Sequence, residues 1–118
     1  NVGRKHSIEH ITKSLRRNPK SKLEIKFEKI INKIQLPYRF VGDGSFFIER
    51  KNPDFINVNG QKIAVEVFFR KHKERVRGGV DEWKNERTEI FNRYGWQLLF
   101  FDELEVNENN VIKVLGKC

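Results

Sequence analysis

The chain has 118 residues, enough for one hydrophobic core but not for two, and no apolar run approaches the roughly 20 residues that cross a bilayer. It carries 24 Lys and Arg against 16 Asp and Glu, and the net charge of +8 favours a polyanion as partner, either nucleic acid or an acidic membrane surface. Its one cysteine, Cys118, excludes an internal disulfide and a cysteine-based zinc site and fits a reducing compartment, so we predict one intracellular domain.

The first 22 residues form a basic arm, with seven Lys and Arg against a single acid, Glu9. A short helix is expected in this arm, ended by Asn18-Pro19. We therefore divide the sequence into the arm, residues 1–22, and a main domain, residues 23–118. The sequence begins with Asn1 rather than Met, which is compatible with a piece of a longer protein.

The main domain alternates helices and strands. Apolar residues from Leu23 to Ile34 recur at spacings of three and four, which predicts a helix from about residue 20 to residue 35. The elements expected after it are strands at 38–41 and 45–49, a hairpin of strands at 54–58 and 62–69, a helix at 80–94, a buried strand at 96–101 and a terminal helix at 106–115. This order describes a small α/β domain.

The hairpin gives the clearest strand signal. Its strands flank Asn59-Gly60, the preferred pair for a tight type I′ turn. A two-residue turn would pair Asp54 with Val65 and place Glu66 on the opposite face of the sheet, unless a bulge intervenes. Glu66 is nevertheless the one charge within Ile63–Phe69, and a buried carboxylate there needs a cation, a hydrogen-bond donor or a metal.

Asp54 is the first candidate for chemistry, because it begins a strand directly after Pro53. Its carboxylate oxygens are hard donors that suit Mg²⁺, and such an ion can bind a phosphodiester oxygen and activate a water molecule. His72 lies in a long basic loop, residues 70–79, of the kind in which functional residues are common. Imidazole titrates near neutral pH, so His72 can serve as a general base, although an ordinary surface histidine also explains it.

Three further carboxylates have ordinary structural explanations as well as catalytic ones. Glu24 and Glu28 share one face of the first predicted helix, where pairing with Lys20 or Lys29 would account for them. Asp81 lies in the first turn of the helix after the basic loop, where a negative charge is favoured by the helix dipole.

Three stretches of the sequence resemble one group of nucleases. They are Asn52-Pro53-Asp54-Phe55-Ile56, Ile63-Ala64-Val65-Glu66-Val67-Phe68 and the buried strand after Tyr94-Gly95. They are similar to the very-short-patch-repair-like branch of the PD-(D/E)xK nucleases, and within it to the EDxHD homing endonucleases of phages and introns. The likeness spans about Leu23 to Leu104 and implies an α/β fold, with helices flanking a mixed central sheet and DNA across one edge. The segment Gly3–Leu15 is similar to small DNA-binding repeats found in homing endonucleases.

The resemblance assigns catalytic roles by position. Asp54 corresponds to the metal-binding aspartate and Glu28 to the glutamate of the first core helix. His72 corresponds to the histidine after the second hairpin strand, and Asp81 to the final aspartate. Glu66 occupies the variable acidic position, from which its backbone carbonyl can still reach a metal. The implied activity is a Mg²⁺-dependent, site-specific DNA endonuclease that hydrolyses phosphodiester bonds, with Mn²⁺ expected to substitute.

Two departures from the pattern bear on this activity. The lysine that the wider superfamily carries two residues beyond its acidic position is Phe68 here, so His72 would have to supply the base or acid. Many relatives also carry a Gly-Asp-Tyr-Trp-His stretch, of which this chain keeps only the histidine. A catalytically degenerate DNA-binding module and an RNA-processing nuclease or RNA-binding domain therefore stay open as alternatives.

The expected partner is duplex DNA rather than a membrane, and a homodimer on the DNA is compatible with this expectation. The expected setting is the cytoplasm of a host cell, with the gene carried by a phage or an intron. Phosphate contacts are expected from basic residues on either side of the hairpin, namely Arg50, Lys51, Arg70, Lys71, Arg75 and Arg77.

Overall fold

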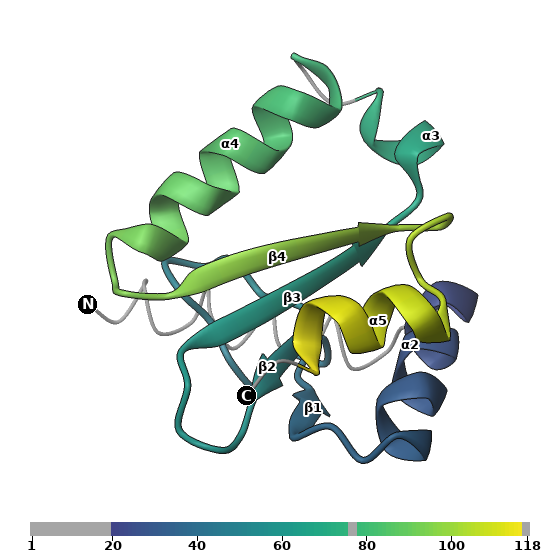
Figure 1. Ribbon diagram of the computed structural model, residues 1–118. Coiled ribbons are helices and arrows are strands. Elements are labelled where there is room, and N and C mark those ends of the chain that lie inside the picture. The colour runs from purple at the N-terminus through teal and green to yellow at the C-terminus, as the bar shows by residue number, and fades with distance from the viewer. Residues whose placement is uncertain (1–19, 76–77, 117–118) are drawn as a thin grey trace.

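The computed structural model describes residues 20–75 and 78–116, and the short helix expected before Asn18 lies outside them. The elements are α2 (Lys22–Lys33), β1 (Tyr38–Phe40), β2 (Phe55–Asn57), β3 (Ile63–Phe68), α3 (Arg70–Lys73), α4 (Gly79–Asn92), β4 (Gln97–Asp102) and α5 (Glu108–Leu115). The strands form one sheet in the order β1-β2-β3-β4, with α2 and α5 on one face and α4 on the other (Figure 1). This confirms the predicted α/β class with a sheet flanked by helices.

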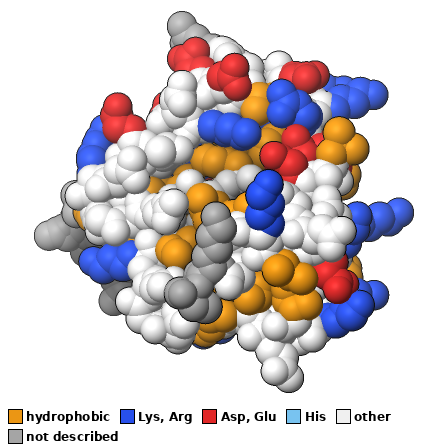
Figure 2. All heavy atoms as spheres, in the orientation of Figure 1, with side chains coloured by type: hydrophobic (Ala, Val, Ile, Leu, Met, Phe, Trp, Pro, Cys, Tyr) orange, Lys and Arg blue, Asp and Glu red, His pale blue; other side chains and the backbone are white. Residues whose placement is uncertain are grey.

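The sheet is mixed because its last pair of strands is parallel. β1, β2 and β3 are antiparallel neighbours, whereas β3 and β4 run parallel from Ile63 opposite Gln97 to Phe68 opposite Asp102. The carboxyl ends of β3 and β4 therefore meet at one end of the sheet, on the right in Figure 1. Lys and Arg side chains project along that edge of the molecule (Figure 2).

No described helix is long and apolar enough to cross a membrane.

Helix α2 begins with a capping box. The Ser21 hydroxyl accepts the Glu24 N–H (3.1 Å), and the Glu24 carboxylate accepts the Ser21 N–H (2.8 Å), so two backbone donors at the helix start are satisfied. Just past the helix end, Gln35 has a positive φ of 56°. The predicted helix is confirmed, two residues shorter at each end, and the apolar stripe that predicted it is buried: Leu23, Phe27, Ile30 and Ile31.

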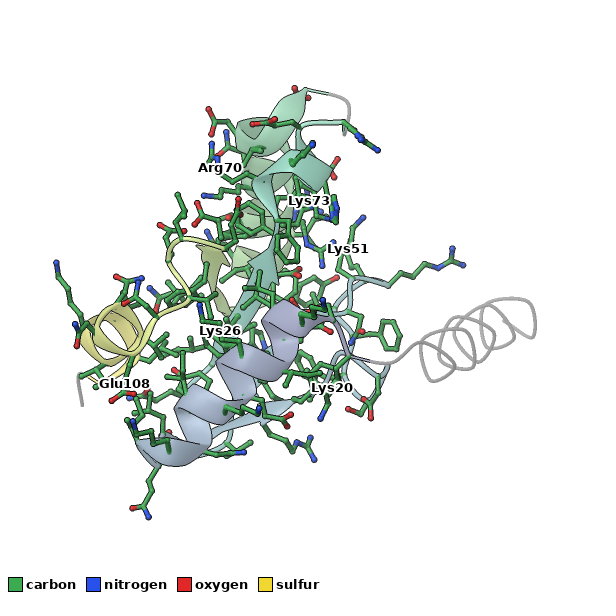
Figure 3. All side chains as sticks on the ribbon, turned by 90° about the vertical axis from the view of Figure 1, so that its right-hand side faces the viewer. Lys20, Lys26, Lys51, Arg70, Lys73 and Glu108 are labelled. Atoms are coloured by element: carbon green, nitrogen blue, oxygen red, sulfur yellow. The ribbon has the colours of Figure 1, made fainter. Side chains whose placement is uncertain are left out.

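Each face of the sheet carries an apolar core. On the α2 side, the Phe27 ring lies 4.8 Å from that of Phe55 and 5.3 Å from that of Phe101, separations at which aromatic pairs are stabilising. On the α4 side, Phe91 packs with Ile56 and other buried residues. Figure 3 shows α2 lying in front of the sheet with α5 beside it. The elements predicted at 80–94, 96–101 and 106–115 are present as α4, β4 and α5, with bounds shifted by at most two residues.

The loop between β2 and β3 is not the predicted two-residue turn. The Asn57 side chain folds back, and its Oδ1 accepts the N–H groups of Asn59 (2.9 Å) and Gln61 (3.0 Å). Gly60 has a φ of 102°, but Asn59 lacks the positive φ that a type I′ turn needs at both central residues. The loop is therefore longer than expected, because a side chain satisfies the backbone donors that a tight turn would pair across the hairpin.

The longer loop shifts the strand register by one residue, so the predicted pairing is wrong. Phe55, not Asp54, lies opposite Val65. Because side chains alternate between the faces of a sheet, a register shift of one residue changes which side chains of the two strands lie on the same face. Asp54 lies just before the paired residues of β2, where its N–H donates to Val65 and its carboxylate accepts the Val67 N–H, so it adjoins the part of β3 that carries Glu66.

The strand predicted at residues 45–49 is absent. This segment forms a turn closed by an isolated bridge between Ile48 and Lys51. Glu49 and Arg50 have positive φ values of 47° and 70°, and two successive left-handed residues reverse the chain instead of extending it. The Asn52 side chain holds the loop, donating to two backbone carbonyls at 2.7 and 2.8 Å.

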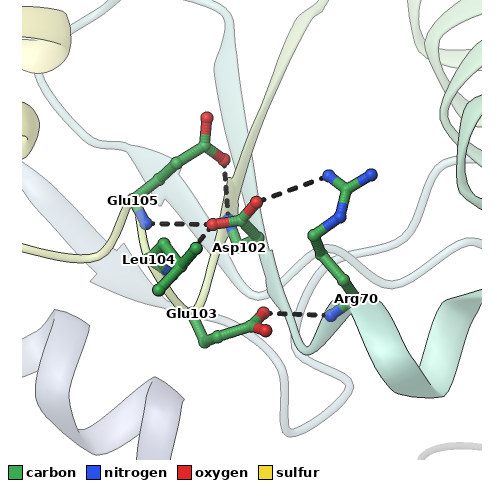
Figure 4. Close-up of polar contacts among 5 residues, drawn as sticks. All are labelled: Arg70, Asp102, Glu103, Leu104 and Glu105. Atoms are coloured by element: carbon green, nitrogen blue, oxygen red, sulfur yellow. Dashed lines mark hydrogen bonds and ion pairs between the residues drawn. The ribbon is translucent and has the colours of Figure 1, made fainter.

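The basic loop after β3 contains a single helical turn, α3, which is tied to the turn after β4 (Figure 4). The Arg70 N–H donates to the Glu103 carboxylate (3.0 Å), and the Arg70 guanidinium lies 3.5 Å from the buried Asp102 carboxylate. Asp102 in turn accepts the N–H groups of Leu104 (2.9 Å) and Glu105 (3.0 Å). Two segments far apart in sequence are thereby fixed together at the end of the sheet.

Candidate active site

Asp54 is held at the entrance of β2 by hydrogen bonds on both sides. Its N–H donates to Val65 (3.0 Å), and its carbonyl accepts the N–H groups of Val41 (2.7 Å) and Gly42 (3.1 Å). Its carboxylate Oδ2 accepts the Val67 N–H of β3 (2.8 Å). The side chain therefore takes the place of a backbone acceptor in the strand ladder, and the carboxylate has a fixed position.

Glu66 lies in the middle of β3, close enough to Asp54 for its charge to act on that carboxylate, and its side chain is 8% exposed. The guanidinium of Arg87, from α4, forms an ion pair with its carboxylate, and the Arg87 side chain is 14% exposed. Lys73 of α3 adds a second positive charge that acts on Glu66. A buried carboxylate needs such partners, and Glu66 receives them from two different helices.

Glu24 completes a group of three carboxylates. It lies in the first turn of α2, where it closes the capping box, and its carboxylate also acts on that of Asp54. Its charge acts on Glu66 as well. Three elements therefore bring carboxylates together: α2 with Glu24, the entrance of β2 with Asp54, and β3 with Glu66.

Burial and neighbouring negative charge make Asp54 and Glu66 reluctant to ionise. Burial raises the pKa of Asp54 well above its usual range, the charge of Glu66 and contact with Glu24 raise it further, and the Val67 N–H works in the opposite direction. Burial also raises the pKa of Glu66, against the lowering influence of Arg87 and Lys73. In their ionised forms, the three carboxylates would therefore carry more negative charge than Arg87 and Lys73 offset.

The donor set fits a hard divalent cation whose coordination is completed by other molecules. Within residues 20–75 and 78–116, no group of three or more His, Cys, Asp or Glu side chains is arranged to hold a metal ion by itself. Mg²⁺ typically takes only one or two protein carboxylates and keeps water or phosphate oxygens in its other positions. Burial raises the pKa of Asp54 and of Glu66, and a bound cation of this kind would favour their ionised forms.

The structure places Glu28 one helical turn beyond Glu24. Its carboxylate accepts the Lys20 ammonium (2.7 Å), which is the surface pairing considered from the sequence. Asp81 is exposed in the first turn of α4, where it favours the helix dipole. His72 is exposed on α3, with its ring 5.4 Å from that of Phe69. The catalytic roles of Glu28, His72 and Asp81 stay predictions.

From the sequence, Glu24 was considered only alongside Glu28 and received no role in the site, and Arg87 was missed, although both left a signal. Arg87 falls in α4 at the spacing of the buried Val80, Trp83 and Phe91, so a cation interrupts a buried stripe. A buried cation in a helix and the lone acid of a core strand are natural partners. The signal for Glu24 is its capping-box spacing, which fixes it in the first turn of α2.

Basic side chains surround the end of the sheet that carries the carboxylates. Figure 3 views this side and labels Lys20, Lys51, Arg70 and Lys73 on it. Among them, Arg70 also forms an ion pair with Asp102. Of the predicted phosphate contacts, Arg50, Lys51, Arg70, Lys71 and Arg75 belong to the described residues, and Arg77 lies outside them.

Comparison with known proteins concerns the fold. No family model matches the sequence, and no curated protein sequence matches it. Among solved structures, the chain is similar to the one titled homing endonuclease I-Bth0305I catalytic domain, with a TM-score of 0.54 and 16% identity over 82% of this chain and 89% of that chain. The chain has the fold of that domain. This restriction-endonuclease-like architecture is the one that the sequence resemblance implied.

The Glu66–Arg87 ion pair gives a stability prediction. Arg87→Ala would leave a buried charge uncompensated, and we expect it to lower the free energy of unfolding by about 3–5 kcal/mol, measured by urea denaturation. Adding Glu66→Gln should restore most of that loss. Arg93→Ala removes exposed ion pairs with Glu89 and Glu49 at the C-terminal end of α4 and serves as the control, with a much smaller expected loss. Equal losses for the two arginine variants would contradict the assignment.

The raised pKa of Asp54 gives a pH prediction. Because the pKa is higher in the folded state than the unfolded value of about 3.9, the folded state holds the proton more tightly. This contribution to the free energy of unfolding is therefore present at low pH and lost as the pH rises through the folded-state pKa. Asp54→Asn keeps an acceptor for the Val67 N–H, and should be more stable than wild type at pH 7 by about 1 kcal/mol.

The measurement is urea unfolding of both proteins from pH 4 to pH 8 without divalent cations. The difference in free energy of unfolding between Asp54→Asn and the wild type should increase as the pH rises. Adding Mg²⁺ should reduce this difference, since a bound cation favours the ionised wild-type carboxylates. A gap that stays constant with pH would refute the pKa assignment.

Proposed function

We propose that this chain is the catalytic domain of a Mg²⁺-dependent DNA endonuclease that cleaves at specific sites. The observation that carries the proposal is the convergence of Glu24, Asp54 and Glu66 at the basic end of the sheet. The likeness of the fold to a homing endonuclease catalytic domain supports it. The net charge of +8 is consistent with a polyanionic substrate.

Asp54 and Glu66 are proposed to hold the cation, with Glu24 joining directly or through a water molecule. When bound, Mg²⁺ would neutralise phosphate charge and make a water molecule more acidic. The Val67 N–H fixes the Asp54 carboxylate relative to β3. Arg87 favours the ionised form of Glu66, as a ligand requires. Mn²⁺ supplies similar chemistry and is expected to substitute.

Proton transfer is assigned to α3 rather than to the strand. The lysine position of the superfamily holds Phe68, which is buried and packs with its ring 5.1 Å from that of Trp83. His72 is proposed to accept a proton from the attacking water or to protonate the leaving oxygen, with Asp81 orienting it. The tie between Arg70 and the turn after β4 holds the helix that carries His72.

Duplex DNA is the proposed substrate, bound through phosphates by the basic residues around this end of the sheet. Lys51 and Arg50 come from the turn before β2, and Lys71 and Arg75 from the segment around α3. Binding through phosphates should weaken steeply with salt. A second copy of the chain on the DNA is compatible with the proposal.

The two glutamates of α2 provide a matched test of the active site. Glu24→Gln should lower the rate at which Mg²⁺-dependent nicking of plasmid DNA occurs by about a hundredfold or more, because Glu24 contacts Asp54. Glu28→Gln makes the same chemical change one helical turn away, where the partner is Lys20, and should keep most of the activity. Loss of activity in Glu28→Gln alone would instead support the assignment from the sequence resemblance.

Asp54→Asn should abolish nicking while leaving duplex binding unchanged, which separates chemistry from affinity. Absence of cleavage by the wild type, with binding retained, would favour the degenerate DNA-binding module. Preferential binding and cleavage of structured RNA in competition with duplex DNA would favour the RNA-processing nuclease.

A further inference from the structure

The outer surface of α2 carries an unusual line of positive charge. Four lysines at spacings of four, three and four residues fall on one side of the helix, since 3.6 residues make a turn. All four are exposed. We call them the lysine stripe: Lys22, Lys26, Lys29 and Lys33. Glu24 and Glu28 lie on the opposite flank of the helix, toward Asp54.

Most of the charge of the lysine stripe is not offset by nearby acids. Lys33 pairs with Glu108 of α5 at 3.0 Å, and this pair is exposed, so it contributes little. Lys22, Lys26 and Lys29 form no ion pair with any acid in residues 20–75 and 78–116. Three cations on about two turns of helix repel one another and favour a bound polyanion.

The stripe borders a groove between α2 and α5. The groove has a volume of about 330 Å³ and is lined by Lys26, Lys29 and Lys33 together with Ile30, Asn107 and Glu108. Figure 3 looks onto this side of the molecule, with Lys26 on α2 and Glu108 on α5. The stripe is therefore open to a large ligand, and three of its lysines line one concave surface.

We propose that the lysine stripe binds the phosphate backbone of duplex DNA beside the cleaved position, as a second contact surface distinct from the basic residues around α3. The inference rests on the proposed nuclease function. The stripe spans twelve residues, a rise of roughly 16 Å along the helix, and each DNA strand presents one phosphate per about 3.4 Å of axis. It is thus long enough to follow several phosphates of one strand. Lysine side chains suit this contact, because they are flexible point charges that require no fixed phosphate geometry.

Duplex DNA fits this surface better than an acidic membrane, because α2 carries both the stripe and Glu24. A duplex held by the stripe would lie at a fixed offset from the carboxylate group, since one rigid helix bears both sets of charges. The side of the molecule that shows Lys26 also shows Lys51 and Lys73 (Figure 3). The stripe would therefore extend the footprint along the DNA without taking part in the chemistry.

The test compares two double variants of the full chain that remove the same charge. Lys26→Gln/Lys29→Gln neutralises the stripe, and Lys62→Gln/Lys113→Gln neutralises two exposed lysines elsewhere. Glutamine has nearly the helix propensity of lysine, so α2 should keep its structure. Binding of a 30-base-pair duplex is followed by fluorescence anisotropy in EDTA over a range of NaCl concentrations.

The stripe variant should bind roughly tenfold more weakly at moderate salt, and its slope of log affinity against log salt should fall by about 1 to 2. The control variant should change little in either quantity. At saturating DNA, the cleavage rate of the stripe variant should equal that of the wild type. A salt slope that is unchanged in the stripe variant would overturn the inference.

Further outcomes separate this inference from the proposed function. A wild type that binds but never cleaves, with a reduced slope in the stripe variant, would refute the nuclease and support the surface. A stripe variant that keeps its DNA affinity but loses binding to phosphatidylserine-rich vesicles would assign the stripe to a membrane and overturn the inference.

Discussion

The hydrogen bond from the Val67 N–H to the Asp54 carboxylate, at 2.8 Å, is the constraint on which the site depends. It joins the entrance of β2 to β3 where regular pairing ends, and it holds Asp54 beside the part of β3 that carries Glu66. One residue more or fewer in the hairpin loop would shift the pairing of β2 with β3 and displace Asp54 relative to Glu66. The Asn57 side chain sets the length of that loop, so a turn at one end of the hairpin decides the chemistry at the other.

Gathering carboxylates in a buried place works against folding, and the rest of the domain offsets this cost locally. Arg87 supplies a counter-charge from α4, and Lys73 adds one from α3. A buried ion pair is weak evidence for stability, but it fixes the position of both partners. The pair therefore gives α4 a role beyond covering the sheet, because this helix carries the cation that favours the ionised form of Glu66. Functional sites commonly hold such locally unfavourable arrangements.

Patterns confined to one element predicted the fold well, and contacts between elements were predicted poorly. The apolar periodicity of α2 and the buried run of β4 are visible in the sequence because burial repeats with the helix or strand period. The hairpin register is not visible in the sequence, because Asn59-Gly60 favours a tight turn while the Asn57 side chain competes for the same backbone donors. Arg87 and Glu24 reach the site only through tertiary packing, which no local pattern specifies.

The orientation of α2 about its own axis links the two charged surfaces. The buried Phe27, packed between the rings of Phe55 and Phe101, fixes which way the helix faces. With that face set, helical spacing sends Glu24 toward Asp54 and the lysine stripe toward the opposite flank. A rotation of the helix would displace both together. Core packing, charge separation and the placement of the carboxylates therefore follow from one set of aromatic contacts, and none of the three can change without affecting the others.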